Sequence, residues 1–167
     1  MDEVFLLQAT QEETIHYINQ PEFIKESIEA LEPNILAVGK SWDILTFLLT
    51  GDGFHENNQH LLSHIWKGFQ PLIIEADAQF PKGVAIILPD EVQNLSDHLS
   101  RALLIDPLLA FNPEKMESLN IQPKEWLKDA YEDLREDVLI QLEELNNFFF
   151  NTAEQANCIL VVFMKTT

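Results

Sequence analysis

The chain has 167 residues, of which 46% are hydrophobic, and it carries ten lysines and arginines against 28 aspartates and glutamates, a formal net charge of −18. This length is enough to bury one core, and we expect a single domain over residues 1–167. The charge repels phosphates, so it argues against binding of nucleic acids or anionic membranes. No apolar run approaches the roughly 20 residues of a membrane span, no signal segment opens the chain, and the cytoplasm is the expected location.

The first third of the chain is predicted to hold one strand and three helices. An apolar strand over residues 4–9 ends at Thr10, which forms a capping-box sequence with Glu13 at the start of a helix. The second helix is led by Pro21, and the third ends at Gly51.

The middle of the chain alternates turn-forming and apolar segments. Residues 51–58 are rich in Gly and Asn and are expected to form an exposed loop, followed by a short helix over residues 60–66. Two β-branched runs, residues 72–75 and 84–88, are predicted strands. Pro89 then leads a helix whose first turn is acidic.

The last third is dominated by one long amphipathic helix. A short helix begins at Asn112, and the long helix is predicted over residues 124–157, before a final apolar strand over residues 158–164. Cys158 is the one cysteine, and we expect a buried, inert thiol. The pattern predicts a layered α/β domain of the mixed α+β kind. Its small mixed sheet has about four strands, with the N- and C-terminal strands central and helices on both faces.

Two segments carry motifs in a fixed order: Lys40 to Gly51, with the sequence KSWDILTFLLTG, and Asn112 to Trp126, with NPEKM, IQP and a tryptophan. Together they resemble the YfbM-like family of bacterial proteins, a domain of unknown function. Members of that family carry a Lys-x-Trp helix ending in Leu-Thr-Gly, an Asp-Pro-x-x-Met turn, an Ile-Tyr-Pro step with a nearby Trp, a long helix and a final strand. The resemblance spans essentially the whole chain and implies the family's fold and a bacterial source.

The chain departs from the family pattern at its most polar positions. Gly39 stands where the family tends to have Asp, Thr46 where it has His, and Gln122 where it has Tyr. Residues 83–86 replace a Pro-Ala-Arg-Tyr step. The resemblance therefore implies a shared architecture rather than a shared reaction, and it brings no cofactor.

The histidines near the middle of the chain are the most suggestive metal ligands. His60 and His64 lie one helical turn apart in the predicted helix, with His55 and Glu56 just before it. The metalloprotease pattern, however, requires Glu directly after the first His of such a pair, where this chain has Leu61. We predict a solvated surface and no metal.

Trp42, Asp43 and Trp126 are the candidate binding residues within the motifs. The two tryptophans are typical of core positions and can also line a pocket. Asp43 is expected at the exposed edge of its helix, with a role in a site as the alternative. No Gly-x-Ser-x-Gly turn and no Gly-rich phosphate loop accompanies them.

Acidic residues form a stripe along the predicted long helix, with Glu132 and Glu136 near its centre. One hypothesis is a non-enzymatic domain that binds a basic protein through this stripe, for example an immunity-type protein that neutralises a basic toxin. The alternative is a small enzyme or small-ligand-binding protein with a site near Trp42, Asp43 and the 51–60 loop.

Overall fold

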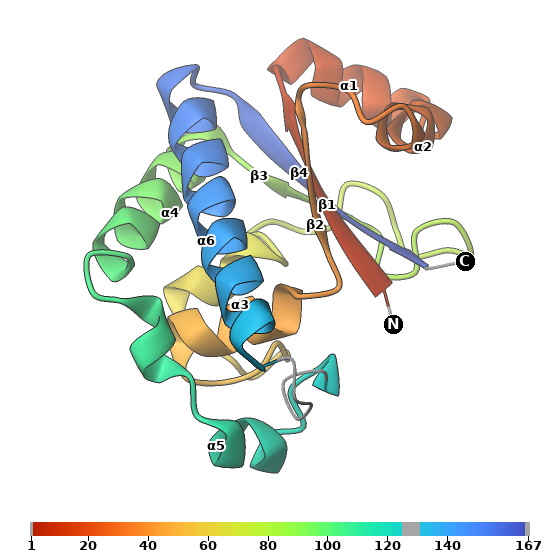
Figure 1. Cartoon of the computed structure of the whole chain (residues 1–167). Helices are drawn as coiled ribbons and strands as arrows, with labels where there is room; N and C mark the ends of the chain where they lie inside the picture. The colour runs from red at the N-terminus through yellow and green to blue at the C-terminus, as the bar shows by residue number, and fades with distance from the viewer. Residues whose placement is uncertain (1, 125–130, 166–167) are drawn as a thin grey trace.

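A computed structural model describes residues 2–124 and 131–165 and shows one β-sheet with helices on both of its faces (Figure 1). The strands are β1 (Asp2–Ala9), β2 (Ile35–Gly39), β3 (Val84–Ile87) and β4 (Cys158–Lys165). The α-helices are α1 (Gln11–Asn19), α2 (Glu22–Glu29), α3 (Trp42–Thr50), α4 (Pro89–Ala102), α5 (Pro113–Ser118) and α6 (Tyr131–Glu154). Two 3-10 helices, η1 (Leu61–Ile65) and η2 (Pro107–Ala110), lie in the connections.

The strand order is β2-β1-β4-β3, which confirms the predicted fold class and the central place of the N- and C-terminal strands. The sheet is antiparallel at every pairing rather than mixed. The reason is visible at β2, where Ile35 lies opposite Leu7. After β1, the helices α1 and α2 bring the chain back to the end of the sheet at which β1 finished, and β2 starts there. A parallel neighbour of β1 would instead require a crossover to the opposite end of the sheet.

Two strand assignments needed correction. β2 was not predicted, because its five residues lie between helical patterns and are too few to show a period. The predicted strand over residues 72–75 contributes only an isolated bridge from Ile74 to Val84. Gly83, at a φ of 69°, turns the chain immediately before β3, so the ladder ends after this single pair.

Most helix boundaries agree with their sequence signals. Thr10 and Glu13 form the predicted capping box of α1, and Gly51 ends α3 in the left-handed conformation. The predicted long helix corresponds to α6, which ends before Ala156, a residue with a φ of 53°. Its predicted first turns fall on residues 125–130, outside the described residues. None of the helices within residues 2–124 and 131–165 has both the length and the apolar composition of a membrane span.

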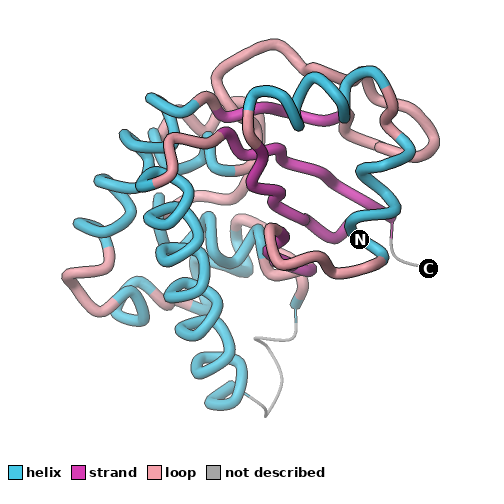
Figure 2. The backbone as a smooth tube through the Cα atoms, turned by 90° about the horizontal axis from the view of Figure 1, so that it is seen from above, coloured by secondary structure: helices cyan, strands magenta, loops and turns pink. Residues whose placement is uncertain are grey.

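Successive residues of the central strands face two separate cores, as expected for a sheet that is covered on both sides. Ile159, Val161 and Phe163 of β4 pack with α3, α4 and α6, whereas Leu160 and Val162 pack with α1 and α2. Figure 2 shows the helices lying on two sides of the strands. The prediction of a final strand buried on both faces is therefore confirmed.

One end of the sheet brings together segments that are far apart in the sequence. Because the pairings are antiparallel, the first residues of β1 and β3 lie beside the last residues of β4, with Asp2 opposite Lys165 and Val84 opposite Val162. The start of α3 is fixed to the same end, since Trp42 Nε1 donates a hydrogen bond of 3.0 Å to the carbonyl oxygen of Asp2. The residues of the candidate site are anchored around this end.

Candidate functional site

A cavity of about 320 Å³ opens at this end of the sheet. Its floor is formed by strand residues of β3 and β4, and its sides by the 51–60 loop, the segment after η1 and the loop before β3. The residues that line it are Phe54, His55, Glu56, Trp66, Lys67, Leu72, Lys82, Gly83, Ala85, Val161 and Phe163. The walls are therefore mainly apolar, with a small number of charged groups.

Three aromatic rings form a cluster beside this cavity. The rings of Trp42, Phe54 and Phe163 have centroids 5.3 to 6.0 Å apart, with Trp42 edge-on to the other two. Lys82 Nζ lies over all three rings, 5.2 Å from the centroid of Phe163 and 5.6 Å from the centroids of Trp42 and Phe54. An ammonium in this position is attracted by the negative faces of the rings.

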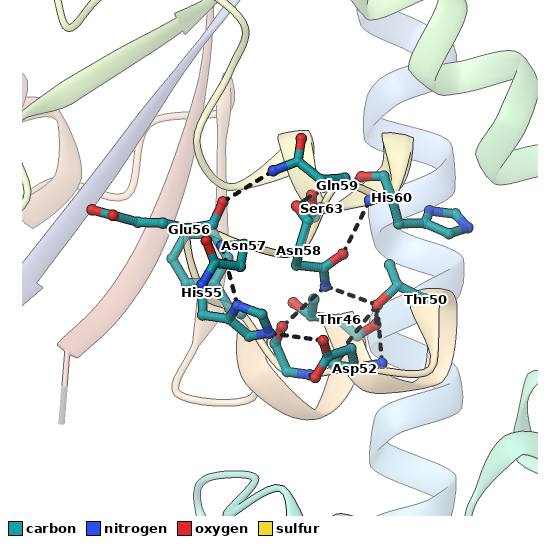
Figure 3. Close-up of polar contacts among 12 residues, drawn as sticks. Thr46, Thr50, Asp52, His55, Glu56, Asn57, Asn58, Gln59, His60 and Ser63 are labelled. Atoms are coloured by element: carbon teal, nitrogen blue, oxygen red, sulfur yellow. Dashed lines mark hydrogen bonds and ion pairs between the residues drawn. The ribbon is translucent and has the colours of Figure 1, made fainter.

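The 51–60 loop is held in shape by Asn58, which is buried (Figure 3). Its amide nitrogen donates to Thr50 Oγ1 and to the carbonyl oxygen of Gly53, and its amide oxygen accepts from the backbone N–H of His60. Its own carbonyl oxygen accepts a hydrogen bond of 2.9 Å from Lys67 Nζ. The predicted exposed loop is thus an ordered wall of the cavity, built around one satisfied polar side chain.

Asp43 ties this loop to α3 and to the segment before α6. It is buried, which corrects the expectation of an exposed helix edge. Its Oδ1 accepts a hydrogen bond of 2.8 Å from the backbone N–H of Phe54, and its Oδ2 accepts one of 2.9 Å from the backbone N–H of Gln122. Asp43 therefore positions the ring of Phe54 rather than facing the cavity itself.

Trp42 and Trp66 are both buried and both hydrogen-bonded. Trp42 is a core residue, as predicted for this tryptophan. Trp66 Nε1 donates a hydrogen bond of 2.6 Å to Thr46 Oγ1, which in turn donates to the carbonyl oxygen of Trp42. Thr46, which stands where the resemblance placed a histidine, therefore holds a wall residue of the cavity in place.

His55 is paired with Asp52 at the mouth of the loop, with 2.7 Å between Nε2 and Oδ2. Burial opposes the charge of Asp52, but the hydrogen bonds from His55 and from the Gly53 N–H, together with the charge of Lys115, outweigh it, so the pKa of Asp52 lies below its usual value. His55 Nδ1 accepts from the backbone N–H of Asn57. Both ring nitrogens are engaged, which leaves no free lone pair for a general base.

The three histidines do not converge on one point. In Figure 3 the imidazole of His60 points away from that of His55. His60 Nδ1 accepts from the Leu62 N–H and caps η1, while His64 Nδ1 donates to the carbonyl oxygen of Gly68. The predicted helix over residues 60–66 is the 3-10 helix η1 (Leu61–Ile65), not the α-helical turn that would align His60 with His64. Within residues 2–124 and 131–165, no group of three or more His, Cys, Asp or Glu is placed to hold a metal ion.

Of the remaining candidate residues, Glu136 and Cys158 are described, and neither lines the cavity. Trp126 falls outside the described residues, and Glu132 is part of α6 but its side chain is not described. Glu136 is exposed on α6. Cys158 is buried, as expected, and burial raises the pKa of its thiol, against a smaller opposing hydrogen bond with Thr14.

The comparison with protein families agrees with this architecture. The model of a domain of unknown function, DUF1877, matches residues 3–162. The chain belongs to the DUF1877 family. Among solved structures, a protein of unknown function, YfbM from Escherichia coli, matches with a TM-score of 0.67 and 17% sequence identity, over 97% of this chain and 99% of that one. At this identity the likeness shows the shared fold, which the YfbM-like resemblance implied. No curated protein matches.

Sequence reasoning missed the two lysines of this DUF1877 domain's cavity. Both occur in loops as a Lys-Gly pair, at Lys67-Gly68 and at Lys82-Gly83. Neither lysine has an acidic residue within four positions, which is unusual in a chain with 28 acidic residues. Isolated bases of this kind are the signal that could have drawn attention to the site.

Proposed function

We propose that this chain binds a small ligand in the cavity between the 51–60 loop and the ends of β3 and β4. The observation that carries the proposal is the cavity itself, with its volume of about 320 Å³ and its mainly apolar walls. Small-molecule sites in proteins typically measure about 300–1,000 Å³ and combine apolar walls with a few placed polar groups.

Hydrogen bonds within the protein hold several wall residues of the cavity in place. Asp43 fixes the backbone of Phe54, Asn58 fixes the loop, and Thr46 fixes Trp66 through hydrogen bonds within the protein. Walls held in this way lose little conformational entropy when a ligand enters. His55, with both ring nitrogens engaged, supports a role in binding rather than in proton transfer.

Leu72 offers a direct test, because it lines the cavity and is also 46% exposed. Leu72→Trp is expected to fill part of the cavity without disturbing the core. It should therefore weaken the binding of a small aromatic probe, either para-trifluoromethylbenzamide or para-trifluoromethylbenzoate, by about tenfold. Fluorine NMR line broadening of the probe measures this directly. The matched control is Leu109→Trp, at a residue that is 77% exposed on η2, where affinity should stay unchanged. Equal probe affinity for both variants would contradict binding in this cavity.

A second proposal is that α6 docks a basic protein. On its outer side the exposed residues Glu136, Ile140, Glu143 and Phe150 follow one another at helical spacing, in steps of four, three and seven positions. Ile140 and Phe150 are each 53% exposed, and ten residues of helix place them about 15 Å apart. Apolar anchors surrounded by charge favour a protein partner, and the acidic residues favour a basic one.

This docking proposal is tested by capture of binding proteins at about 50 mM and about 500 mM salt, since salt screens attraction between exposed charges. A partner recovered at low salt is expected to be lost at high salt and lost with the double variant Ile140→Ala, Phe150→Ala. It should be retained with Ile15→Ala, which removes a residue that is 59% exposed on α1. Recovery that is indifferent to salt and to the double variant would count against the proposal.

A further inference from the structure

We propose that the ligand of this cavity is a small organic anion, with a carboxylate or similar group attached to an apolar ring or chain. This inference rests on the proposed ligand-binding function and specifies the chemistry of the same site. It is carried by the two lysines that line the cavity, Lys67 and Lys82.

Lys82 supplies a cation that the described protein does not neutralise. Its Nζ contacts the three rings of the aromatic cluster, and among residues 2–124 and 131–165 it forms no hydrogen bond or ion pair. An ammonium has three N–H donors. All three of these donors remain available to an anion in the cavity, while the rings hold the ammonium at the edge of the cavity.

Lys67 supplies a second cation on a different segment, directly after η1. Its Nζ donates one hydrogen bond, to the carbonyl oxygen of Asn58, which fixes the side chain and leaves two donors. That partner is a neutral carbonyl, so the positive charge of Lys67 also lacks a carboxylate counterion among the described residues. A fixed cation with free donors is suited to charge-assisted hydrogen bonds with an anionic group.

The local charge of the cavity is opposite in sign to that of the whole chain. The cavity is lined by two lysines and by one carboxylate, that of Glu56. The charged lining residues are therefore net positive, whereas the whole protein carries a net charge of −18. In Figure 3 the Glu56 side chain extends away from the hydrogen bonds that hold the loop. At physiological salt, charges more than about 8 Å away are largely screened, so the nearby lysines dominate the field that a bound ligand experiences.

The apolar walls define the rest of the ligand. Phe54, Leu72, Val161 and Phe163 present rings and branched chains to the cavity and can bury an aromatic or aliphatic body. An inorganic anion would leave these walls in contact with water, whereas an organic anion covers them. The combination therefore favours a molecule with one charged end and one apolar end.

The experiment compares three probes of similar shape: para-trifluoromethylbenzoate, para-trifluoromethylbenzamide and para-trifluoromethylbenzylamine, which are anionic, neutral and cationic. Fluorine NMR titration of the full chain measures the affinity for each. We expect the benzoate to bind about tenfold more tightly than the benzamide. Lys82→Gln and Lys67→Gln should each remove most of that preference, and Lys82→Arg should retain it.

The controls separate this inference from the function on which it rests. Lys25→Gln changes the net charge equally, on α2 at the opposite face of the sheet, and should leave all affinities unchanged. Lys82 makes no hydrogen bond to the described protein, so Lys82→Gln loses only the contact of the ammonium with the rings and should melt within about 4 °C of the parent. Equal affinity for the benzoate and the benzamide would overturn the anion assignment and leave ligand binding standing. The same holds if the benzylamine binds most tightly, because its ammonium would then take the position of the Lys82 ammonium over the rings. Failure of all three probes to bind would overturn both.

Discussion

Replacing Asp43 with alanine is expected to lower the free energy of unfolding by about 3–5 kcal/mol, measured by urea denaturation. The buried carboxylate accepts two backbone N–H groups, from Phe54 and from Gln122, which lies 79 positions away in the chain. Alanine leaves both donors without a partner. Hydrogen bonds to a charged group contribute more than neutral ones, and unpaired buried donors add their desolvation cost.

Two further variants show whether this loss comes from the paired hydrogen bonds. Asp43→Asn keeps one acceptor oxygen and should lose roughly half as much stability. Asp137→Ala removes the same charge at an exposed position of α6 and should change stability by no more than about 0.5 kcal/mol. A loss in Asp43→Ala no larger than that in Asp137→Ala would mean that the two backbone contacts do not hold the loop.

Gly83→Ala is the second substitution with a large expected effect, about 3 kcal/mol of lost stability together with loss of probe binding. The φ of Gly83 is 69°, and an added Cβ would overlap the carbonyl oxygen of Ile74 and approach within 2.8 Å of Leu72 Cδ1. The backbone would have to move to relieve this overlap. Because Lys82 directly precedes Gly83, its ammonium would leave its place over the aromatic rings.

Gly39→Ala isolates the conformational part of this effect. Gly39 has a similar φ of 74°, but no atom lies within 4 Å of the position that a Cβ would take. Its replacement should cost about 1 kcal/mol, the usual penalty for a side chain in the left-handed region. Thermal or urea unfolding of both variants gives the difference, and equal losses would show that the overlap with Ile74 is relieved without cost.

Local signals predicted those parts of the fold that local chemistry determines. The capping box at Thr10, the Gly51 stop and the Pro89 helix start each depend on a few neighbouring residues, and all three appear in the structure. The antiparallel direction of the sheet and the edge strand β2 depend on where α1 and α2 return the chain. Tertiary packing determines that path of the chain, and local patterns in a single sequence do not reveal it.

The candidate site was predictable only in part, for the same reason. The sequence indicated the region of Trp42, Asp43 and the 51–60 loop, because turn residues and motif residues gather there. The prediction of an exposed Asp43 was wrong because its burial depends on two hydrogen-bond donors, the N–H groups of Phe54 and Gln122. These are backbone atoms, which have no sequence signature. Lys82 reaches the aromatic cluster only after β3 and β4 have paired.

The pairing of β1 with β4 has a consequence for how the chain folds. Asp2 to Ala9 meet Cys158 to Lys165 residue by residue, with residues 10–157 between them. The central ladder of the sheet therefore closes the longest loop in the domain, and such distant contacts slow folding because the chain entropy is lost before the contacts form. During synthesis on the ribosome, β1 cannot pair with β4 until β4 has emerged. The cavity at this end of the sheet, which β4 helps to line, can form only then.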